Sequence, residues 1–285
     1  MLYLSSFDFP SIDEEHAFFM SIQRKCYDSF YPFQVISRHH LTHLELEPVT
    51  ILYGGNGSGK STALNVIAEK LRLGRDTLYN RSNFFEDYTD LCMFELEQAV
   101  SAQSCIITSD DVFDYMLNLR SLNEGIDQKR EELFSEYLDV KYAQFQLKSL
   151  EDYEHLKKMN QARTYTQSKY VRKNVMDNVR EYSNGESAFT YFTNKIQEDG
   201  LFLLDEPENS LSPMLQQELV HFLEDSVRFF GCQLLIATHS PFLLAMKGAK
   251  IYDLDADPVK ESRWVDLPAV RVYYDFFKAH EKDFK

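Results

Sequence analysis

A glycine-rich loop between an apolar segment and a periodic segment constrains the fold of this chain more than any other feature. The apolar run Val49–Tyr53 predicts a buried strand, and the periodic run Lys60–Leu71 predicts a helix. The loop between them fills the pattern G-x-x-x-x-G-K-[ST]. Its residues are Gly54, Gly55, Asn56, Gly57, Ser58, Gly59, Lys60, Ser61 and Thr62. Strand, loop and helix in this order predict a phosphate-binding P-loop.

Each part of this motif has a chemical reason. Glycines let the loop turn tightly and point backbone N–H groups inward, which makes a concave anion site. The following helix adds its positive N-terminal end. We expect Lys60 to reach the β- and γ-phosphates of a nucleotide and the Ser61 hydroxyl to ligate Mg²⁺. All nine loop residues are therefore candidate nucleotide ligands.

Composition narrows the class of protein further. The chain has 285 residues, which allows one large domain or two small ones. No apolar run approaches the roughly 18 residues of a membrane span, so we expect no integral membrane segment. The N-terminus has no basic leader, and the four cysteines are scattered without a CxxC pair. We therefore expect a cytoplasmic protein without a disulfide or zinc framework.

The charge of the chain is unevenly distributed. The net charge is −15, so the mean field does not steer the protein to nucleic acid. In the basic stretch from Lys157 to Arg180, seven basic residues stand against one acid, Asp177. Two interpretations stay open for this stretch: a solvated helix face, or a patch for phosphate or nucleic-acid backbone.

The middle of the chain has a different pattern from its ends. Residues 111–180 are highly charged, with apolar residues at spacings of three and four, and Gly125 is a candidate break between two helices. We interpret this segment as a helical subdomain inserted into one composite core of residues 1–110 and 181–285. In the second half, Leu201–Leu204 and Gln233–Thr238 are expected strands around a helix from Pro213 to about Phe229. Continuous apolar strands between helices indicate a parallel sheet covered on both faces.

Polar residues follow both of these strands. Asp205 and Glu206 end the first strand in the Walker B form, where α/β sheets place ligands. We expect Asp205 to hold Mg²⁺ and Glu206 to act as general base on the attacking water. His239 ends the next strand and is expected to hydrogen-bond the γ-phosphate or that water.

A second anion site is predicted around Ser183 and Gly185, which open a helical run toward Ile196. One nucleotide does not need two such sites. Two chains arranged head to tail would supply both sites to each nucleotide.

The order of these motifs resembles an ABC-type ATPase. After the P-loop come a Ser-x-Gly-Glu signature at Ser183–Glu186, the run Leu204–Ser212 and the run Ala237–Pro241. The chain is similar to the soluble predicted AAA-type ATPases related to RecF and SMC heads, over about Leu41–Phe94 and Glu181–Phe277. The resemblance implies an α/β P-loop NTPase fold, an ABC-ATPase head whose mixed or parallel sheet is covered by helices, with an inserted helical subdomain.

The resemblance also implies an ATP-state homodimer with two ATP molecules at its interface. Ser183 and Gly185 of one chain would close on the γ-phosphate that Lys60 of the other chain holds. Residues 209–211 match the D-loop along that interface, and His239 matches the switch histidine. ATP and Mg²⁺ are the implied cofactors.

Some parts of the family pattern are not evident. The signature has Asn184 and Glu186 where many relatives have glycine and glutamine. No Q-loop glutamine follows the candidate strand at residues 105–107, and Asp110 is a candidate substitute. The aromatic residue that stacks on adenine stays open between Tyr31, Phe33 and their neighbours.

Three functions fit these features. The first is an ATP-hydrolysing switch that acts on a nucleic-acid or protein partner. The second is the nucleotide-binding subunit of a transporter, which the missing Q-loop and the Ser-x-Gly-Glu signature disfavour. The third is a low-turnover ATP sensor in a regulatory or defence system, which the presence of Glu206 as a base disfavours.

Overall fold

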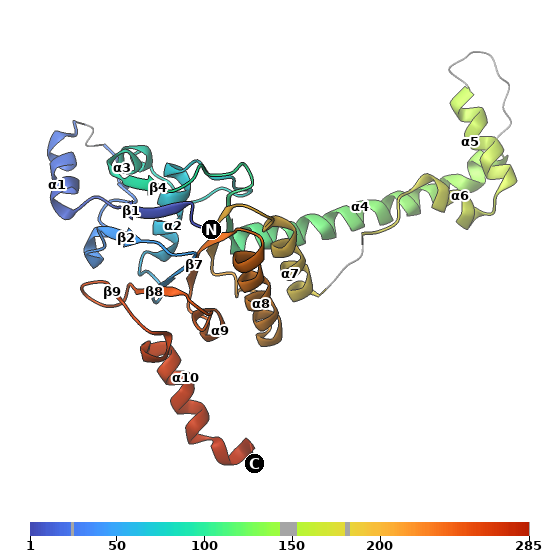
Figure 1. Ribbon diagram of the computed structural model, residues 1–285. Helices are drawn as coiled ribbons and strands as arrows, with labels where there is room; N and C mark the ends of the chain where they lie inside the picture. The colour runs from blue at the N-terminus through green and yellow to red at the C-terminus, as the bar shows by residue number, and fades with distance from the viewer. Residues whose placement is uncertain (24–25, 143–152, 180–182, 285) are drawn as a thin grey trace. The chain divides into compact units, whose positions relative to one another are not determined.

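The computed structural model describes residues 1–23, 26–142, 153–179 and 183–284 (Figure 1). The chain divides into two compact units, which are described separately. The first, here called the ATPase unit, contains Met1–Phe113 and Asn184–Lys285. The second, the helical unit, contains Asp114–Ser183.

A six-stranded sheet forms the centre of the ATPase unit, in the order β5-β6-β7-β3-β8-β9. Its strands are β3 (Val49–Tyr53), β5 (Cys105–Thr108), β6 (Leu201–Asp205), β7 (Gln233–Thr238), β8 (Lys250–Asp253) and β9 (Lys260–Glu261). All neighbouring pairs are parallel except β8 and β9. The predicted α/β fold with a mixed sheet is therefore confirmed.

The register of these strands decides where polar side chains meet. Thr108 pairs with Asp205, Asp205 with Ala237, and Tyr53 with Thr238. The carboxyl ends of four adjacent parallel strands therefore lie at one edge of the sheet. In open α/β sheets, this edge is where ligands bind.

A second, smaller sheet is antiparallel and has the order β2-β1-β4. Its strands are β1 (Leu4–Asp8), β2 (His43–Glu45) and β4 (Met93–Leu96). The Gln233 side chain joins the two sheets, because its Oε1 accepts hydrogen bonds from the backbone N–H groups of Tyr3 and Leu4 at 2.7 and 2.9 Å.

Helices and short 3-10 turns surround the sheets of the ATPase unit. The helices are α1 (Ile12–Ser21), α2 (Lys60–Lys70), α3 (Phe85–Leu91), α7 (Asn184–Lys195), α8 (Pro213–Phe229), α9 (Pro241–Leu244) and α10 (Pro268–Ala279), with 3-10 turns η1 (Ser37–His39), η3 (Trp264–Asp266) and η4 (Glu281–Phe284). Helix α8 has the predicted bounds, because Ser212 caps it by accepting from the Leu215 N–H and Pro213 occupies its first turn. Helix α2 buries most of its side chains, which holds the P-loop rigidly against the sheet.

The helical unit is built from α4 (Ser109–Tyr142), which begins in the ATPase unit, and from α5 (Tyr153–Thr164) and α6 (Gln167–Asn174) (Figure 1). The predicted break at Gly125 is wrong, because α4 continues through it. A glycine inside a helix costs only about 1 kcal/mol relative to alanine. Asn123 and Ile126 on either side are buried, and Asn123 bonds both the N–H and the C=O of Val179.

The core of the helical unit is small, and its five buried members are Leu133, Tyr137, Ala162, Tyr170 and Val171. Part of the basic stretch is engaged within this unit. The Lys173 ammonium donates to the Tyr165 hydroxyl at 2.8 Å, and Lys169 lies over the same ring. Arg180 belongs to the basic stretch but lies outside the described residues.

Two expectations from composition can be compared with the structure. The four cysteines are all free, namely Cys26, Cys92, Cys105 and Cys232. Within the described ranges, no helix combines the length and the apolar composition that a bilayer crossing requires.

Candidate active site

The P-loop joins β3 to α2 in the predicted way. Gly57 and Gly59 have φ angles of +83° and +90°, a region that residues with a Cβ rarely adopt. A Cβ at Gly54 would collide with the Ser58 side chain. Gly59 caps α2 without a side-chain hydrogen bond, so the first N–H groups of the helix are directed at the loop. These features are those of a cradle for phosphate oxygens.

A cavity of about 270 Å³ lies over this loop. It is lined by Val35, Asn56, Gly57, Ser58, Gly59, Lys60, Ser61, Thr62 and Glu206. The Ser58 hydroxyl is buried and has no hydrogen-bond partner among the described residues. A concave site with glycine N–H groups, an unpaired hydroxyl and one ammonium group fits a polyphosphate.

Lys60 and the first two loop glycines contact each other. The Lys60 side chain is 5% exposed, and its Nζ donates to the carbonyl oxygens of Gly54 at 2.7 Å and Gly55 at 3.0 Å. The same Nζ lies 3.8 Å from Oε1 of Glu206. On the other side, the Asp255 carboxylate accepts from the Gly55 N–H at 2.9 Å. The ammonium group is thereby held at the loop beside the Walker B acids.

Ser61 and Asp205 form the predicted metal-binding pair. The Ser61 hydroxyl donates to Oδ1 of Asp205 at 3.0 Å. Burial raises the pKa of Asp205 to about 6, and the hydrogen bond from Ser61 opposes this rise only in part. An ionised carboxylate that is costly to bury, next to a hydroxyl oxygen, fits Mg²⁺, which prefers oxygen ligands and takes few of them from protein.

Glu206 and His239 come together from adjacent strand ends. Glu206 has φ +48°, an uncommon value for a residue with a side chain, and its N–H donates to the Ala237 carbonyl at 2.9 Å. Its Oε2 accepts from the Asn209 amide at 3.1 Å, and its Oε1 lies 3.9 Å from Nδ1 of His239. Non-glycine residues in this conformation are concentrated at functional sites.

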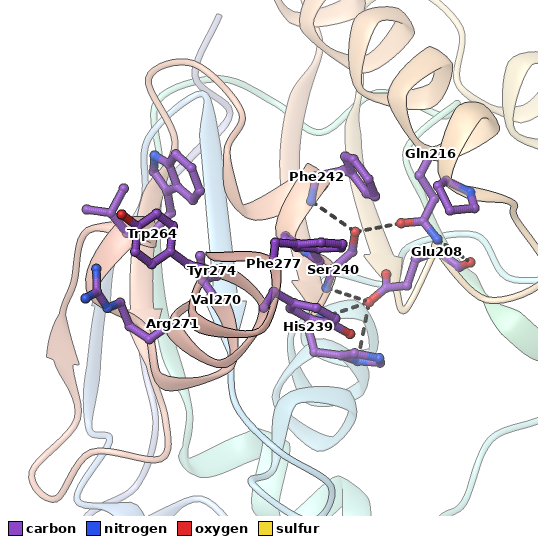
Figure 2. A pocket seen from close by; sticks show the side chains of 14 residues that line it. Glu208, Gln216, His239, Ser240, Phe242, Trp264, Val270, Arg271, Tyr274 and Phe277 are labelled. Atoms are coloured by element: carbon purple, nitrogen blue, oxygen red, sulfur yellow. Dashed lines mark hydrogen bonds and ion pairs between the residues drawn. The ribbon is translucent and has the colours of Figure 1, made fainter. Parts of the chain in front are cut away.

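Glu208 was not among the predicted site residues, although it lies in the same turn. Its side chain is 5% exposed and contacts the end of β7, where it accepts hydrogen bonds from Thr238, His239 and Ser240 (Figure 2). The turn also borders an apolar pocket of about 920 Å³, whose walls include aromatic residues of α10. The only signal in the sequence was a third acid, two residues after Glu206.

The signature residues lie elsewhere in the ATPase unit. Gly185 is in the first turn of α7, and a Cβ there would approach Leu215 to 2.7 Å and the Ser210 carbonyl to 3.3 Å. Within the described part of the chain, neither Ser183 nor Gly185 lines the P-loop cavity. The contribution of these two residues to a nucleotide site stays a prediction.

The structure separates the remaining candidates. Phe33 is buried and its ring stacks on Phe18 at 4.6 Å, so it does not face a nucleotide. The Tyr31 hydroxyl donates to Thr62 at 3.0 Å, and Val35 reaches the cavity. At the end of β5, Asp110 is exposed, whereas the following residue, Asp111, is buried and accepts from the Thr108 N–H and hydroxyl.

Comparison with protein families places the chain. It belongs to the ABC transporter family, because the model with that description matches residues 41–209, more than half of the chain. A second model, described as "AAA domain, putative AbiEii toxin, Type IV TA system", matches residues 178–245. No curated protein matches the sequence. The resemblance to ABC-type P-loop ATPases is confirmed, and ATP binding and hydrolysis are the general activities of this class.

Similar folds occur among solved structures. One is the ATP-binding cassette MJ0796, a dimer in a post-hydrolysis state with ADP and Pi, with 13% identity over 78% of this chain and 88% of that chain, at a TM-score of 0.36. Another is an SMC head bound to the C-terminal winged-helix domain of ScpA, with 14% identity over 78% of this chain and 92% of that chain, at a TM-score of 0.39.

Proposed function

We propose that this ABC-type ATPase works as a switch: ATP closes two chains head to tail, hydrolysis opens them, and the motion acts on a nucleic-acid or protein partner. The observation that carries the proposal is the meeting of three motifs at one sheet edge. Ser61 contacts Asp205, and Glu206 lies 3.8 Å from Lys60 and 3.9 Å from His239. The free cysteines support a reducing compartment such as the cytoplasm.

The residues at this edge have complementary tasks in hydrolysis. The loop N–H groups and Lys60 bind and orient the phosphates, and Ser61 with Asp205 would hold the metal ion. Bound Mg²⁺ would neutralise phosphate charge during the reaction. Glu206 accepts a proton from the attacking water, and His239 orients that water or the terminal phosphate.

The position of Gly185 supports the head-to-tail arrangement. Its close approach to Ser210 brings the signature next to the D-loop rather than into the P-loop cavity of the same chain. A second copy of the chain would then bring the signature to the nucleotide.

Complementation between two inactive variants tests this arrangement. Lys60→Ala disables the P-loop of its own chain, and Ser183→Arg places a bulky cation in the signature. Each variant alone should lose nearly all turnover. In a head-to-tail mixed dimer, one of the two sites combines an intact P-loop with an intact signature. An equal mixture should therefore recover about a quarter of the wild-type rate.

The control for this experiment is a mixture of Lys60→Ala with Glu206→Gln. Both substitutions affect residues on the same side of the nucleotide, so the site with the intact P-loop carries the defective base. No recovery is expected in this mixture. Recovery in neither mixture, although the variants form dimers, would place Ser183 in the same site as its own P-loop and contradict the arrangement.

A further inference from the structure

Glu208 connects the turn after β6 to the turn after β7. One carboxylate oxygen, Oε1, accepts from the Thr238 hydroxyl at 2.6 Å, the His239 N–H at 2.9 Å and the Ser240 N–H at 3.2 Å (Figure 2). Ser240 is the residue that caps α9. Glu208 therefore holds three consecutive residues that connect the end of β7 to α9.

The same oxygen also faces the imidazole ring of His239. The distance from Glu208 Oε1 to Nδ1 is 3.4 Å, shorter than the 3.9 Å from Glu206 Oε1 to that nitrogen. A carboxylate beside one ring nitrogen selects the ring orientation and the nitrogen that carries the proton. The outer nitrogen, Nε2, is then directed away from Glu208.

The charge of Glu208 is not needed to cap the turn. Its second oxygen, Oε2, is buried without a hydrogen-bond partner among the described residues. Burying an unpaired carboxylate oxygen costs free energy, and a neutral amide or hydroxyl would satisfy the same backbone donors at a lower cost. A buried charge kept at such a cost indicates a role beyond folding.

We propose that Glu208 is a positioning residue for ATP hydrolysis, which orients the His239 ring toward Glu206 and keeps the two strand-end turns in register. The inference rests on the proposed role of His239 and extends it. Glu208 itself touches neither the phosphate cavity nor the Mg²⁺ pair, since the residues at those places are Glu206, Ser61 and Asp205.

A double-mutant cycle between Glu208 and His239 separates positioning from structural support. Glu208→Gln keeps an oxygen that can accept from the turn but removes the charge beside the ring. In the wild-type background, kcat should fall about tenfold. The KM for ATP should stay within about twofold, because the P-loop contacts are unchanged. In the His239→Ala background, the same substitution should change kcat less than about twofold.

Two further variants keep the cycle interpretable. Gln216→Met removes the acceptor of the Ser240 hydroxyl, at 2.7 Å, and so disturbs the same turn without a charge beside His239. It should lower the Tm while leaving kcat near the wild-type value. If Glu208→Gln does not fold, Glu208→Asp draws the carboxylate back from the ring and takes its place in the cycle.

The outcomes distinguish this inference from the function beneath it. Equal losses of kcat in both backgrounds, or an unchanged kcat in Glu208→Gln, would overturn the positioning role alone. An unchanged kcat in His239→Ala would overturn both the role of His239 and this inference. A loss in Glu208→Gln that disappears without the imidazole supports it.

Discussion

The ATPase unit and the helical unit use charged residues in opposite ways. In the ATPase unit, Lys60, Asp205 and Glu208 are largely removed from solvent and bond to specific partners at the ends of strands. In the helical unit, ion pairs such as Arg130–Asp127 and Lys129–Glu132 lie on exposed helix faces. Exposed pairs of this kind contribute little to stability, so those positions tolerate change. The comparison teaches that chemistry is concentrated in the first unit and that the second can vary while its helices persist.

The largest expected effect is at the base of the ATPase unit. Glu206→Gln keeps the shape of the side chain but cannot accept the proton, so kcat should fall by roughly 10²-fold or more. ATP binding should survive, and the trapped ATP should favour a dimer. Phosphate release and light scattering with saturating Mg-ATP measure the two effects. A monomer under these conditions would count against the proposed dimer.

The next effect concerns nucleotide binding. Lys60→Ala removes the ammonium group at the P-loop, and the affinity for ATP should fall roughly 10- to 100-fold, as expected for a lost charge-assisted hydrogen bond. Equilibrium titration with a fluorescent ATP analogue measures the change. A matched change in the other unit, Lys129→Ala, should leave the affinity unaltered. Wild-type affinity in Lys60→Ala would remove the basis of the P-loop assignment.

A core substitution in the helical unit tests whether the two units are separable. Tyr137 is buried, and its hydroxyl donates to the Tyr165 carbonyl at 2.9 Å. Tyr137→Ala should destabilise the helical unit by about 3 kcal/mol while leaving ATP affinity unchanged. Hydrogen exchange resolved by segment locates the loss. Faster exchange in α2 as well would show that the units unfold together.

A smaller effect is expected from the buried carboxylate of Asp205. Its pKa of about 6 lies above the ordinary value of 3.8, so in this window the folded state binds a proton that the unfolded state has released. Stability therefore falls as the pH rises through the window, and the full cost is present above about pH 6. Without nucleotide, Asp205→Asn should raise the Tm at pH 8 by roughly 2–4 °C.

The same variant provides its own check at other conditions. Below about pH 4 the advantage of Asp205→Asn should disappear, because the wild-type carboxyl is then neutral in both states. Mg-ATP should reverse the order, since the wild type gains more from ligand binding. Thermal unfolding across pH, with the exposed Glu86→Gln as control, tests the sign; a lower Tm for Asp205→Asn at pH 8 would contradict it.

The smallest effect on basal turnover is expected in the basic stretch. Because Lys169 and Lys173 engage Tyr165 on an exposed helix face, reversing Lys169, Arg172 and Lys173 to Glu should change basal kcat less than about twofold. If the stretch binds nucleic acid, the triple variant should reduce the salt dependence of that binding and any stimulation of turnover. Filter binding at low salt measures this; no retention by the wild type would favour a protein partner.

Local signals in the sequence were sufficient for the elements that carry the motifs. The P-loop pattern, the cap at Ser212 with Pro213, and the apolar runs that end at Asp205 and Thr238 each depend on neighbouring residues. Turn chemistry and strand burial act over a few positions, so such elements could be located without the fold. The resemblance of the combined motifs to ABC-type ATPases followed from their order.

Contacts between distant segments were decided only by the tertiary structure. Glu208 meets Thr238, thirty positions later, because β6 pairs with β7, and no periodicity in either strand encodes that pairing. Val35 reaches the P-loop cavity, and Phe33 is buried against Phe18, for reasons of packing. Helix α4 continues through Gly125 because tertiary contacts on both sides outweigh the small propensity cost of a glycine. Short-range pattern thus determined which residues carry the chemistry, and long-range packing determined which of them touch.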